Sequence, residues 1–276
     1  MSTKKAKIIS IINMKGGVGK TTLSVGICSY LSEFYNKKVL LIDSDPQFNS
    51  TQAFLDPETY EKYSKDSKTI FKLFEPQTKL FQNTLPKKED LIISVKNYKN
   101  LDLLCGDLNL VLVNKSADYH LVKSLKKFIL NNKLREEYDY IFIDCPPTLT
   151  IYTDSALVCS DYYLIPNRID RYSNIGISSL QKAVSSLIEQ EELDLKCLGL
   201  IYTIVGESLS EKQKKVKNEI EQNPDTKDIR IFKSSMSQVN DLQVGRQGPI
   251  AIKYIKSKKD IKDIVDEIEN ILINEV

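Results

Sequence analysis

The residues best suited to chemistry lie near the start of the chain, in a glycine-rich segment that contains two lysines. The segment reads Lys15-Gly16-Gly17-Val18-Gly19-Lys20-Thr21-Thr22. Backbone N–H groups in such a loop can wrap phosphate oxygens, and a helix that follows points its positive end at them. In this arrangement Lys20 would reach the β- and γ-phosphates, and the Thr21 hydroxyl would coordinate Mg²⁺. We therefore predict a nucleotide site in this segment.

The loop departs from the usual phosphate-loop pattern, G-x-x-x-x-G-K-[ST], at one position. Met14 stands where the first glycine belongs, and Lys15 adds a second lysine inside the loop. A lysine on the rim of a phosphate site needs an anion as its partner. A second nucleotide site, on another copy of the chain, would supply one.

Two acidic segments follow short apolar runs, as expected of loops at the ends of buried strands. The first is Asp43-Ser44-Asp45-Pro46-Gln47, and the second is Asp144-Cys145-Pro146-Pro147. Taken alone, the first is equally well interpreted as an acidic turn closed by proline, and the second is common in α/β proteins. Beside the glycine-rich loop, Asp144 is expected to bind Mg²⁺ directly or through water, and Asp43 to lie near the metal. A carboxylate at a strand end, such as Asp45, can also orient a water near the γ-phosphate.

Apolar runs that suit buried strands alternate with segments of helical periodicity along the chain. This alternation predicts an α/β fold of three layers, with a mostly parallel, twisted sheet and helices on both faces. Together with the strand, glycine-rich loop and helix at residues 8–35, it is the arrangement expected of a P-loop NTPase fold. We expect a single domain over residues 1–276, with short helices between residues 54 and 100. The expected strands are residues 8–12, 39–42, 101–104, 140–143, 162–165 and 198–202, and the expected helices are 23–35, 118–131, 177–188, 211–222 and 259–273.

Composition narrows the possible functions. None of the five cysteines lies in a CxxC pair and His120 is the one histidine, so neither a zinc site nor a disulfide framework is expected. No apolar run approaches the roughly 18 residues that span a bilayer. A net charge of +2 neither requires nor forbids a nucleic-acid partner.

Residues 14–22 resemble the deviant Walker A loop of the ParA/Soj/MinD superfamily, which also includes the nitrogenase iron protein. The two acidic segments resemble that family's switch I and switch II. The resemblance implies an ATPase that binds MgATP and dimerises around it, with Lys15 reaching the partner's ATP. It implies that Lys20 and Asp45 also take part in catalysis, and that Asp45 positions the attacking water. It places Pro166 and Thr203 at the base, where Asn167 could add a hydrogen bond.

Three roles within the superfamily compete. A metal-cluster carrier would need bridging cysteines, and Cys145 lies inside the second acidic segment rather than at the family's ligand positions. A MinD-like membrane ATPase would need a basic C-terminal amphipathic helix, whereas the polar positions from Asp260 onward are largely acidic. Plasmid or chromosome partition fits best, with the MinD-like role as the alternative.

The partition role implies several partners and a location. These are an ATP-dependent homodimer, a ParB-like centromere-binding adaptor that stimulates hydrolysis, and non-specific DNA, in a cytoplasmic, nucleoid-associated protein with no membrane partner. Because only residues 1–13 precede Met14, no helix-turn-helix domain is expected there. In the family a DNA-binding arginine lies where this chain has Ser237. The candidate DNA contacts among the C-terminal lysines and arginines are Arg230, Lys233, Arg246 and Lys253.

Overall fold

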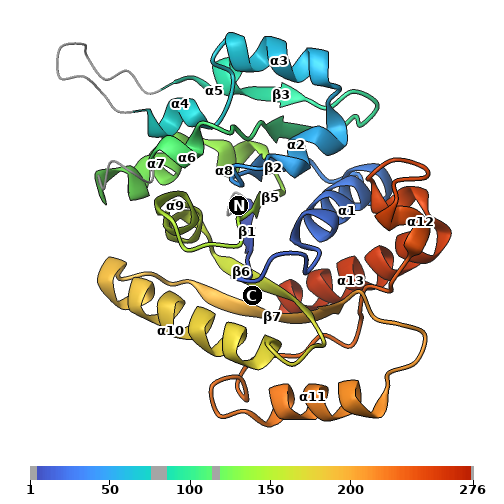
Figure 1. Ribbon diagram of the computed structural model, residues 1–276. Coiled ribbons are helices and arrows are strands. Elements are labelled where there is room, and N and C mark those ends of the chain that lie inside the picture. Colours follow the sequence, from blue (N-terminus) through green and yellow to red (C-terminus); the bar gives the residue numbers. More distant parts are fainter. Residues whose placement is uncertain (1–4, 76–85, 114–118, 275–276) are drawn as a thin grey trace.

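The fold is built on one seven-stranded sheet (Figure 1). The computed structural model describes residues 5–75, 86–113 and 119–274. The strand order is β3-β4-β2-β5-β1-β6-β7, and every neighbouring pair is parallel except β3 with β4. The strands are β1 (Lys7–Ile11), β2 (Val39–Asp43), β3 (Ile92–Ser94), β4 (Leu101–Leu104), β5 (Tyr140–Asp144), β6 (Tyr162–Arg168) and β7 (Lys196–Thr203).

Helices cover both faces of this sheet, which confirms the predicted three-layer α/β architecture (Figure 1). On one face lie α1 (Lys20–Phe34) and α13 (Ile255–Asn274), and on the other α7 (Ser124–Asn131), α9 (Ile151–Cys159) and α10 (Ser173–Glu191). Successive side chains of a strand point to opposite faces, so Ile9 packs in the core with α1 while Ile8 packs in the core with α9. This double burial explains why the strands are continuous apolar runs.

Shorter elements connect these layers. Most of the places where the structure differs from the sequence prediction lie in these elements. Short helices between residues 54 and 100 are present as predicted, but the antiparallel edge strand β3 was not predicted. Its three residues are too few to show an alternating pattern. The shorter helices are α2 (Asn49–Phe54), α3 (Pro57–Lys65), α4 (Phe71–Phe74), α5 (Lys88–Leu91), α6 (Leu110–Val113), η1 (Tyr119–Lys123), α8 (Leu134–Glu137), α11 (Glu211–Gln222), α12 (Asn240–Gln243) and η2 (Ala251–Lys253).

Two other segments also differ from the prediction. The helix expected over residues 118–131 begins as the 3₁₀ helix η1 and becomes α-helical at Ser124. Helix α9 was missed because most of its residues are buried, which leaves no polar stripe to reveal a helical period. Its start does carry a local signal, since the Thr150 side chain accepts a hydrogen bond from the Thr153 N–H.

The carboxyl ends of the parallel strands lie at one edge of the sheet, and this edge collects the predicted chemistry. Asp43 ends β2, Asp144 ends β5 and Thr203 ends β7. The glycine-rich loop leaves the same edge after β1 and leads into α1 at Lys20. Ligands of open α/β sheets bind at this edge.

Candidate nucleotide-binding site

The glycine-rich loop is shaped to leave its N–H groups free. Gly17 and Gly19 have φ angles of +71° and +81°, in the left-handed region that glycine adopts without a steric penalty. Within the described part of the chain, the N–H groups of residues 16–19 donate no hydrogen bond. A Cβ added to Gly16 or Gly17 would meet nothing within 4 Å, so the inside of the loop is open. Unpaired N–H groups at the start of a helix form an anion-binding site.

Lys20 is buried beneath this loop without a carboxylate bonded to it. The side chain is 7% exposed, and its Nζ donates to the main-chain oxygens of Asn13 at 3.1 Å and Lys15 at 3.2 Å. Burial lowers the pKa of the ammonium, while the charges of Asp144 and Asp45 partly counteract that effect. A buried cation held only by carbonyl groups is stabilised by an anion.

Asp144 lies at the centre of a group of hydroxyls. Its Oδ2 accepts hydrogen bonds from Thr21 Oγ1 at 2.8 Å and Ser50 Oγ at 2.7 Å, and its Oδ1 accepts from Ser24 Oγ at 3.2 Å. Burial raises the pKa of Asp144 to about 6, although the bonds from Ser50 and Thr21 counteract part of the rise. The sequence predicted that Asp144 and Thr21 share a metal, and the structure brings the two side chains into contact.

Asp43 and Asp45 lie beside Asp144 on the neighbouring strand end. Asp43 Oδ2 accepts from both the N–H and the hydroxyl of Thr51, each at 2.8 Å. Burial, and after it the charge of Asp144, raises the pKa of Asp43. The carboxylate of Asp45 accepts from the Gln47 N–H at 2.9 Å and is 7% exposed. The charges of Asp144 and Asp45 act on Lys20, and Asp43 interacts with both of these carboxylates.

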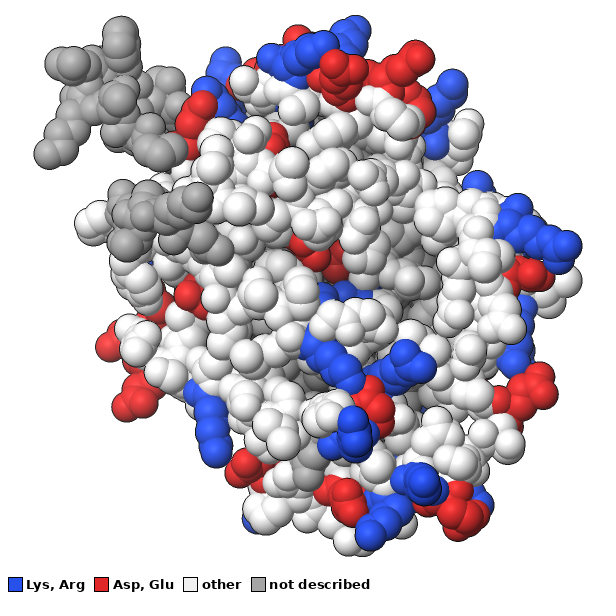
Figure 2. All heavy atoms as spheres, viewed as in Figure 1, with Lys and Arg blue, Asp and Glu red and all other residues white. Residues whose placement is uncertain are grey.

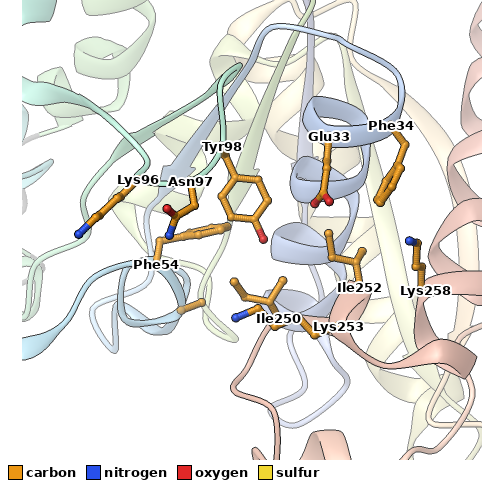
Figure 3. A pocket seen from close by; sticks show the side chains of 11 residues that line it. Glu33, Phe34, Phe54, Lys96, Asn97, Tyr98, Ile250, Ile252, Lys253 and Lys258 are labelled. Atoms are coloured by element: carbon orange, nitrogen blue, oxygen red, sulfur yellow. The ribbon is translucent and has the colours of Figure 1, made fainter.

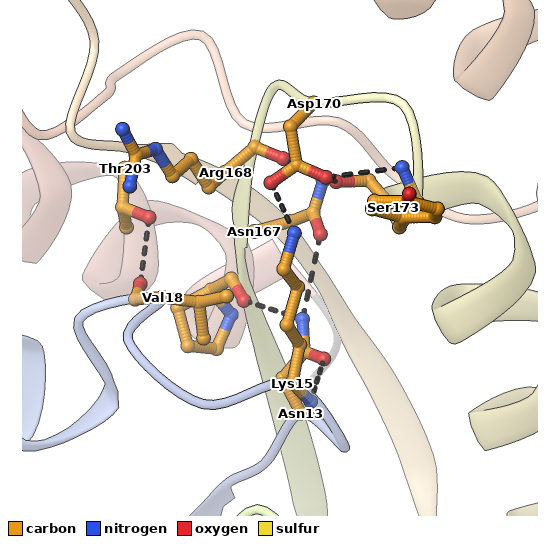
Figure 4. A network of polar contacts seen from close by, with 10 residues as sticks. Asn13, Lys15, Val18, Asn167, Arg168, Asp170, Ser173 and Thr203 are labelled. Carbon is orange, nitrogen blue, oxygen red and sulfur yellow. Dashed lines mark hydrogen bonds and ion pairs between the residues drawn. The ribbon is translucent and has the colours of Figure 1, made fainter.

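Lys15 points away from Lys20, toward the loop after β6. Its ammonium forms an ion pair with Asp170, and its own N–H donates to Asn13 Oδ1 at 2.9 Å (Figure 4). The two charged side chains are 31% and 29% exposed. Lys15 is therefore held at the surface and is partly exposed to solvent.

A family model described as an AAA domain matches residues 6–197. The sporulation initiation inhibitor protein Soj of Bacillus subtilis is 31% identical over 72% of this chain and 73% of its own length. The chromosome partitioning protein ParA of Myxococcus xanthus is 30% identical over 72% of this chain and 65% of its own length.

The chain belongs to the ParA/Soj family.

Solved structures share the fold of this chain. An ATP complex of McdA from Cyanothece matches with a TM-score of 0.79 and 22% identity over 98% of this chain and 97% of that one. A plasmid partition protein of Borrelia burgdorferi B31, bound to AMPPNP, matches with a TM-score of 0.73 and 26% identity over 99% and 100%. The predicted fold and the predicted family are both confirmed.

The residues expected at the base are only partly together. Thr203 Oγ1 donates to the Val18 carbonyl at 2.7 Å and lines a cavity of about 220 Å³ next to the glycine-rich loop. Pro166 and Asn167 do not line this cavity: both accept hydrogen bonds from the Asn13 side chain, which ties them to the start of the loop (Figure 4). Arg168, which the sequence did not single out, lines the cavity instead.

The four candidate DNA contacts do not form one patch. Arg230 and Lys233 line a hollow that also contains Asp263, Asp266 and Glu267. Arg246 pairs with a nearby aspartate at 3.4 Å, and Lys253 lines a different pocket. In Figure 2, basic and acidic side chains alternate along the rim of the molecule, while basic side chains gather beside a hollow at the centre of this face.

Several polar residues of the site were missed by sequence reasoning. Asn13 holds the base of the loop, Ser24 and Ser50 bond to Asp144, and Thr51 bonds to Asp43. Ser24 lies one helical turn after Lys20, so a helix at this place predicts that the two share a face. Ser50 and Thr51 follow the first acidic segment, but nothing in their spacing says which carboxylate each would meet.

None of the helices in the described ranges combines the length and apolar composition needed to span a membrane.

Proposed function

We propose that this ParA/Soj-family protein is a partition ATPase that binds MgATP, dimerises around it, binds DNA non-specifically and hydrolyses ATP slowly. The observation that carries the proposal is Lys20, a buried ammonium with no bonded carboxylate. It lies under a loop in which the N–H groups of residues 16–19 have no partners among the described residues. A triphosphate supplies the anion that both features require. The ATP-bound McdA and the AMPPNP-bound partition protein of Borrelia, which share this fold, support the same ligand.

The nucleotide is held by residues 15–22 in this proposal. The N–H groups of Gly16, Gly17, Val18, Gly19, Lys20, Thr21 and Thr22 surround the phosphates, with the Lys20 ammonium on the β- and γ-phosphates. Thr203 packs against the loop near the base, with Pro166 and Asn167 behind it and Arg168 on the cavity wall. The base therefore lies between the ends of β6 and β7.

The metal site combines protein and phosphate oxygens. Thr21 and Asp144 already meet at 2.8 Å, and Asp43 lies beside them. No group of three or more acidic, cysteine or histidine side chains that could hold a metal alone occurs in the described ranges. This fits Mg²⁺, which uses one or two carboxylates together with substrate phosphates and water. When bound, Mg²⁺ neutralises the charge that develops on the transferred phosphoryl group.

Asp45 and Lys15 complete the catalytic set. Asp45, held by the Gln47 N–H, orients the attacking water on the open side of the γ-phosphate. Lys15 leaves Asp170 and reaches the phosphates of the partner subunit's nucleotide, where its charge stabilises the transition state as an arginine finger does. The site is therefore incomplete in one subunit, and hydrolysis depends on the dimer.

In the cell, the ATP dimer binds the nucleoid and a ParB-like, centromere-bound adaptor stimulates hydrolysis. In the family a DNA-binding arginine lies at the position of Ser237. In this chain DNA phosphates are contacted instead by lysines and arginines of the C-terminal quarter, which include Arg230, Lys233, Arg246 and Lys253. The Ser237 N–H donates to Asp260 at 2.8 Å, so an acidic side chain lies at that position. The whole chain, residues 1–276, acts as one domain.

The test is binding to a random-sequence DNA duplex, measured by fluorescence anisotropy with ATP, with ADP and without nucleotide. We expect binding only with ATP, with an affinity that falls steeply as salt rises. Asp45→Ala is expected to retain ATP and DNA binding but not to hydrolyse, and Lys15→Gln to bind ATP without binding DNA. If ATP-loaded protein ignores DNA at low salt and instead binds vesicles of anionic phospholipid, the MinD-like role replaces partition.

A further inference from the structure

A second pocket lies at the far end of α1 from the nucleotide loop (Figure 3). Helix α1 starts at Lys20 and ends at Phe34, so its rise of about 1.5 Å per residue separates the two sites by roughly 20 Å. The cavity has a volume of about 460 Å³. This is the size of pockets that hold small organic molecules, about 300–1,000 Å³.

The walls of this pocket are aromatic and aliphatic side chains from four segments. Phe34 comes from α1, Phe54 from α2 and Tyr98 from the turn before β4, and Ile250 and Ile252 close the cavity from the C-terminal part of the chain. The rings of Phe54 and Tyr98 meet edge to face, with centroids 5.7 Å apart and planes at 84°. Figure 3 shows these rings facing the same space. A planar apolar body is the ligand shape that such walls accommodate.

The same pocket carries an excess of positive charge. Lys96, Lys253 and Lys258 line it, against the single carboxylate of Glu33. None of the three lysines forms an ion pair with a carboxylate in the portion of the chain that is described. The Lys258 ammonium instead lies 4.0 Å from the centroid of the Phe34 ring. Unpaired lysines over aromatic walls attract an anion that also has an apolar part.

We propose that this pocket is a binding site for a small organic anion that carries a planar apolar ring system. The ring packs between the Phe34 and Phe54 sides of the cavity and the acidic group is held by Lys258, while Lys96 adds positive charge at the opposite end of the cavity without contacting that group (Figure 3). A phosphate of duplex DNA would satisfy the lysines but leave the aromatic walls exposed to water, because the sugar–phosphate backbone has no planar apolar face. The site is separate from the nucleotide loop, and the inference does not depend on the proposed partition function.

The experiment uses 1-anilinonaphthalene-8-sulfonate, whose fluorescence rises when its rings leave water, with the full chain in the absence of nucleotide. Lys258→Glu is expected to weaken binding at least fivefold, and Lys96→Glu, at the opposite end of the pocket, to weaken it about two- to fivefold. The matched controls Lys259→Glu and Lys99→Glu make the same charge change at residues that do not line the pocket, and are expected to change affinity less than twofold. Far-ultraviolet circular dichroism and the thermal midpoint verify that each variant is folded.

A second probe separates charge from ring packing. N-phenyl-1-naphthylamine has the same rings without the sulfonate, so we expect weaker binding to the unmodified protein and no loss in Lys258→Glu. Equal losses of the sulfonate probe in Lys258→Glu and Lys259→Glu would overturn the proposal, since binding would then follow net charge. Unchanged binding in both wall variants would overturn it as well.

Discussion

Lys15 and Lys20 lie in one loop, yet they meet opposite environments. Lys20 is buried and bonded only to carbonyl oxygens, whereas Lys15 is partly exposed and paired with Asp170. The sequence predicted that Lys20 lies beneath the loop, because a glycine-rich loop before a helix fixes where that side chain points. It could not predict the partner of Lys15, since Asp170 lies 155 residues further along the chain and becomes a neighbour only when β6 packs beside β1.

The ion pair between Lys15 and Asp170 predicts a restraint on dimer formation. If Lys15 must leave Asp170 to reach a partner's nucleotide, Asp170→Asn removes a competing interaction. A partly exposed pair of this kind is worth about 0.2–1 kcal/mol, and a symmetric dimer breaks two of them, so we expect the ATP-dependent dimer to become about two- to thirtyfold tighter. Sedimentation velocity of Asp45→Ala with ATP, with and without Asp170→Asn, measures the change.

Asp194→Asn is the matched control for that measurement, because its side chain is 93% exposed and lies in a distant loop. It is expected to leave the dimer constant unchanged. A weaker dimer in Asp170→Asn would contradict the restraint, and would mean that Asp170 holds Lys15 in its productive position.

Asp154 predicts a pH-dependent stability that does not involve the nucleotide. Burial in α9 raises the pKa of its carboxyl from 3.8 to about 6. Between these pH values the native state binds more protons than the unfolded state, so this group makes the protein less stable as pH rises. A fully buried group with this pKa would cost roughly 3 kcal/mol, and remaining solvent contact and the positive helix start reduce this to about 1 kcal/mol.

Asp154→Asn is therefore expected to raise the free energy of unfolding by about 1 kcal/mol at pH 7.5, and the gain should vanish below about pH 3, where both states are protonated. Urea denaturation at a series of pH values gives both numbers. A gain that is independent of pH would show that the substitution acts through packing rather than through the charge.

At the scale of elements, local pattern predicted the buried strands and the long helices, and failed where tertiary contacts decide the structure. Strand β6 illustrates the difference. The predicted strand ends near Pro166, since proline lacks an N–H, but the observed strand continues to Arg168. The pairing with β1 stops at Leu164, so no donor is needed toward β1 at Pro166, and β7 carries the pairing onward.

Two glycines of different elements predict opposite effects of the same substitution. Gly199 in β7 has a φ of +150°, and an added Cβ would lie 2.6 Å from the Phe232 ring and 2.7 Å from the Arg230 carbonyl. Gly199→Ala is expected to lower the free energy of unfolding by about 2–4 kcal/mol through strain and overpacking. A Cβ added to Gly176 in α10 would lie in open space, so Gly176→Ala is expected to raise the free energy of unfolding by about 0.5–1 kcal/mol.

Urea denaturation compares the two alanine variants with the original chain at one pH. Each variant adds one methyl group, so the added atoms alone cannot explain why one variant would be less stable and the other more stable than the original chain. Equal effects at the two positions would contradict the close approach of residues 230–232 to β7.

At the scale of the whole molecule, the sheet brings together segments that the sequence shows only in order. The strand order β3-β4-β2-β5-β1-β6-β7 places β1 between β5 and β6, so Asp144 and the glycine-rich loop become neighbours. No periodicity encodes that order, and the sequence predicted the shared site only because motifs of known chemistry occur at strand ends. The same topology separates Arg230 and Lys233 from Lys253, which the sequence had grouped by proximity along the chain.

ATP binding is expected to stabilise the whole folded molecule. Lys20 should account for the stabilisation by bound nucleotide within one subunit, and Lys15 for the further stabilisation by dimerisation. ATP at 100 times its dissociation constant stabilises the native state by about 2.7 kcal/mol, which for a chain of this size raises the thermal midpoint by roughly 5–10 °C. Lys20→Ala is expected to abolish the rise, because the buried phosphate contact is lost. Lys15→Ala should keep the rise in thermal midpoint measured at low protein concentration, since its own nucleotide pocket is intact. It should lose the further rise with protein concentration that a dimer produces by mass action.

Differential scanning fluorimetry of Asp45→Ala and of both lysine variants, over a hundredfold range of protein concentration, separates the two effects. A concentration-dependent midpoint that survives in Lys15→Ala would remove Lys15 from the dimer interface, while the Lys20 result would still stand on its own.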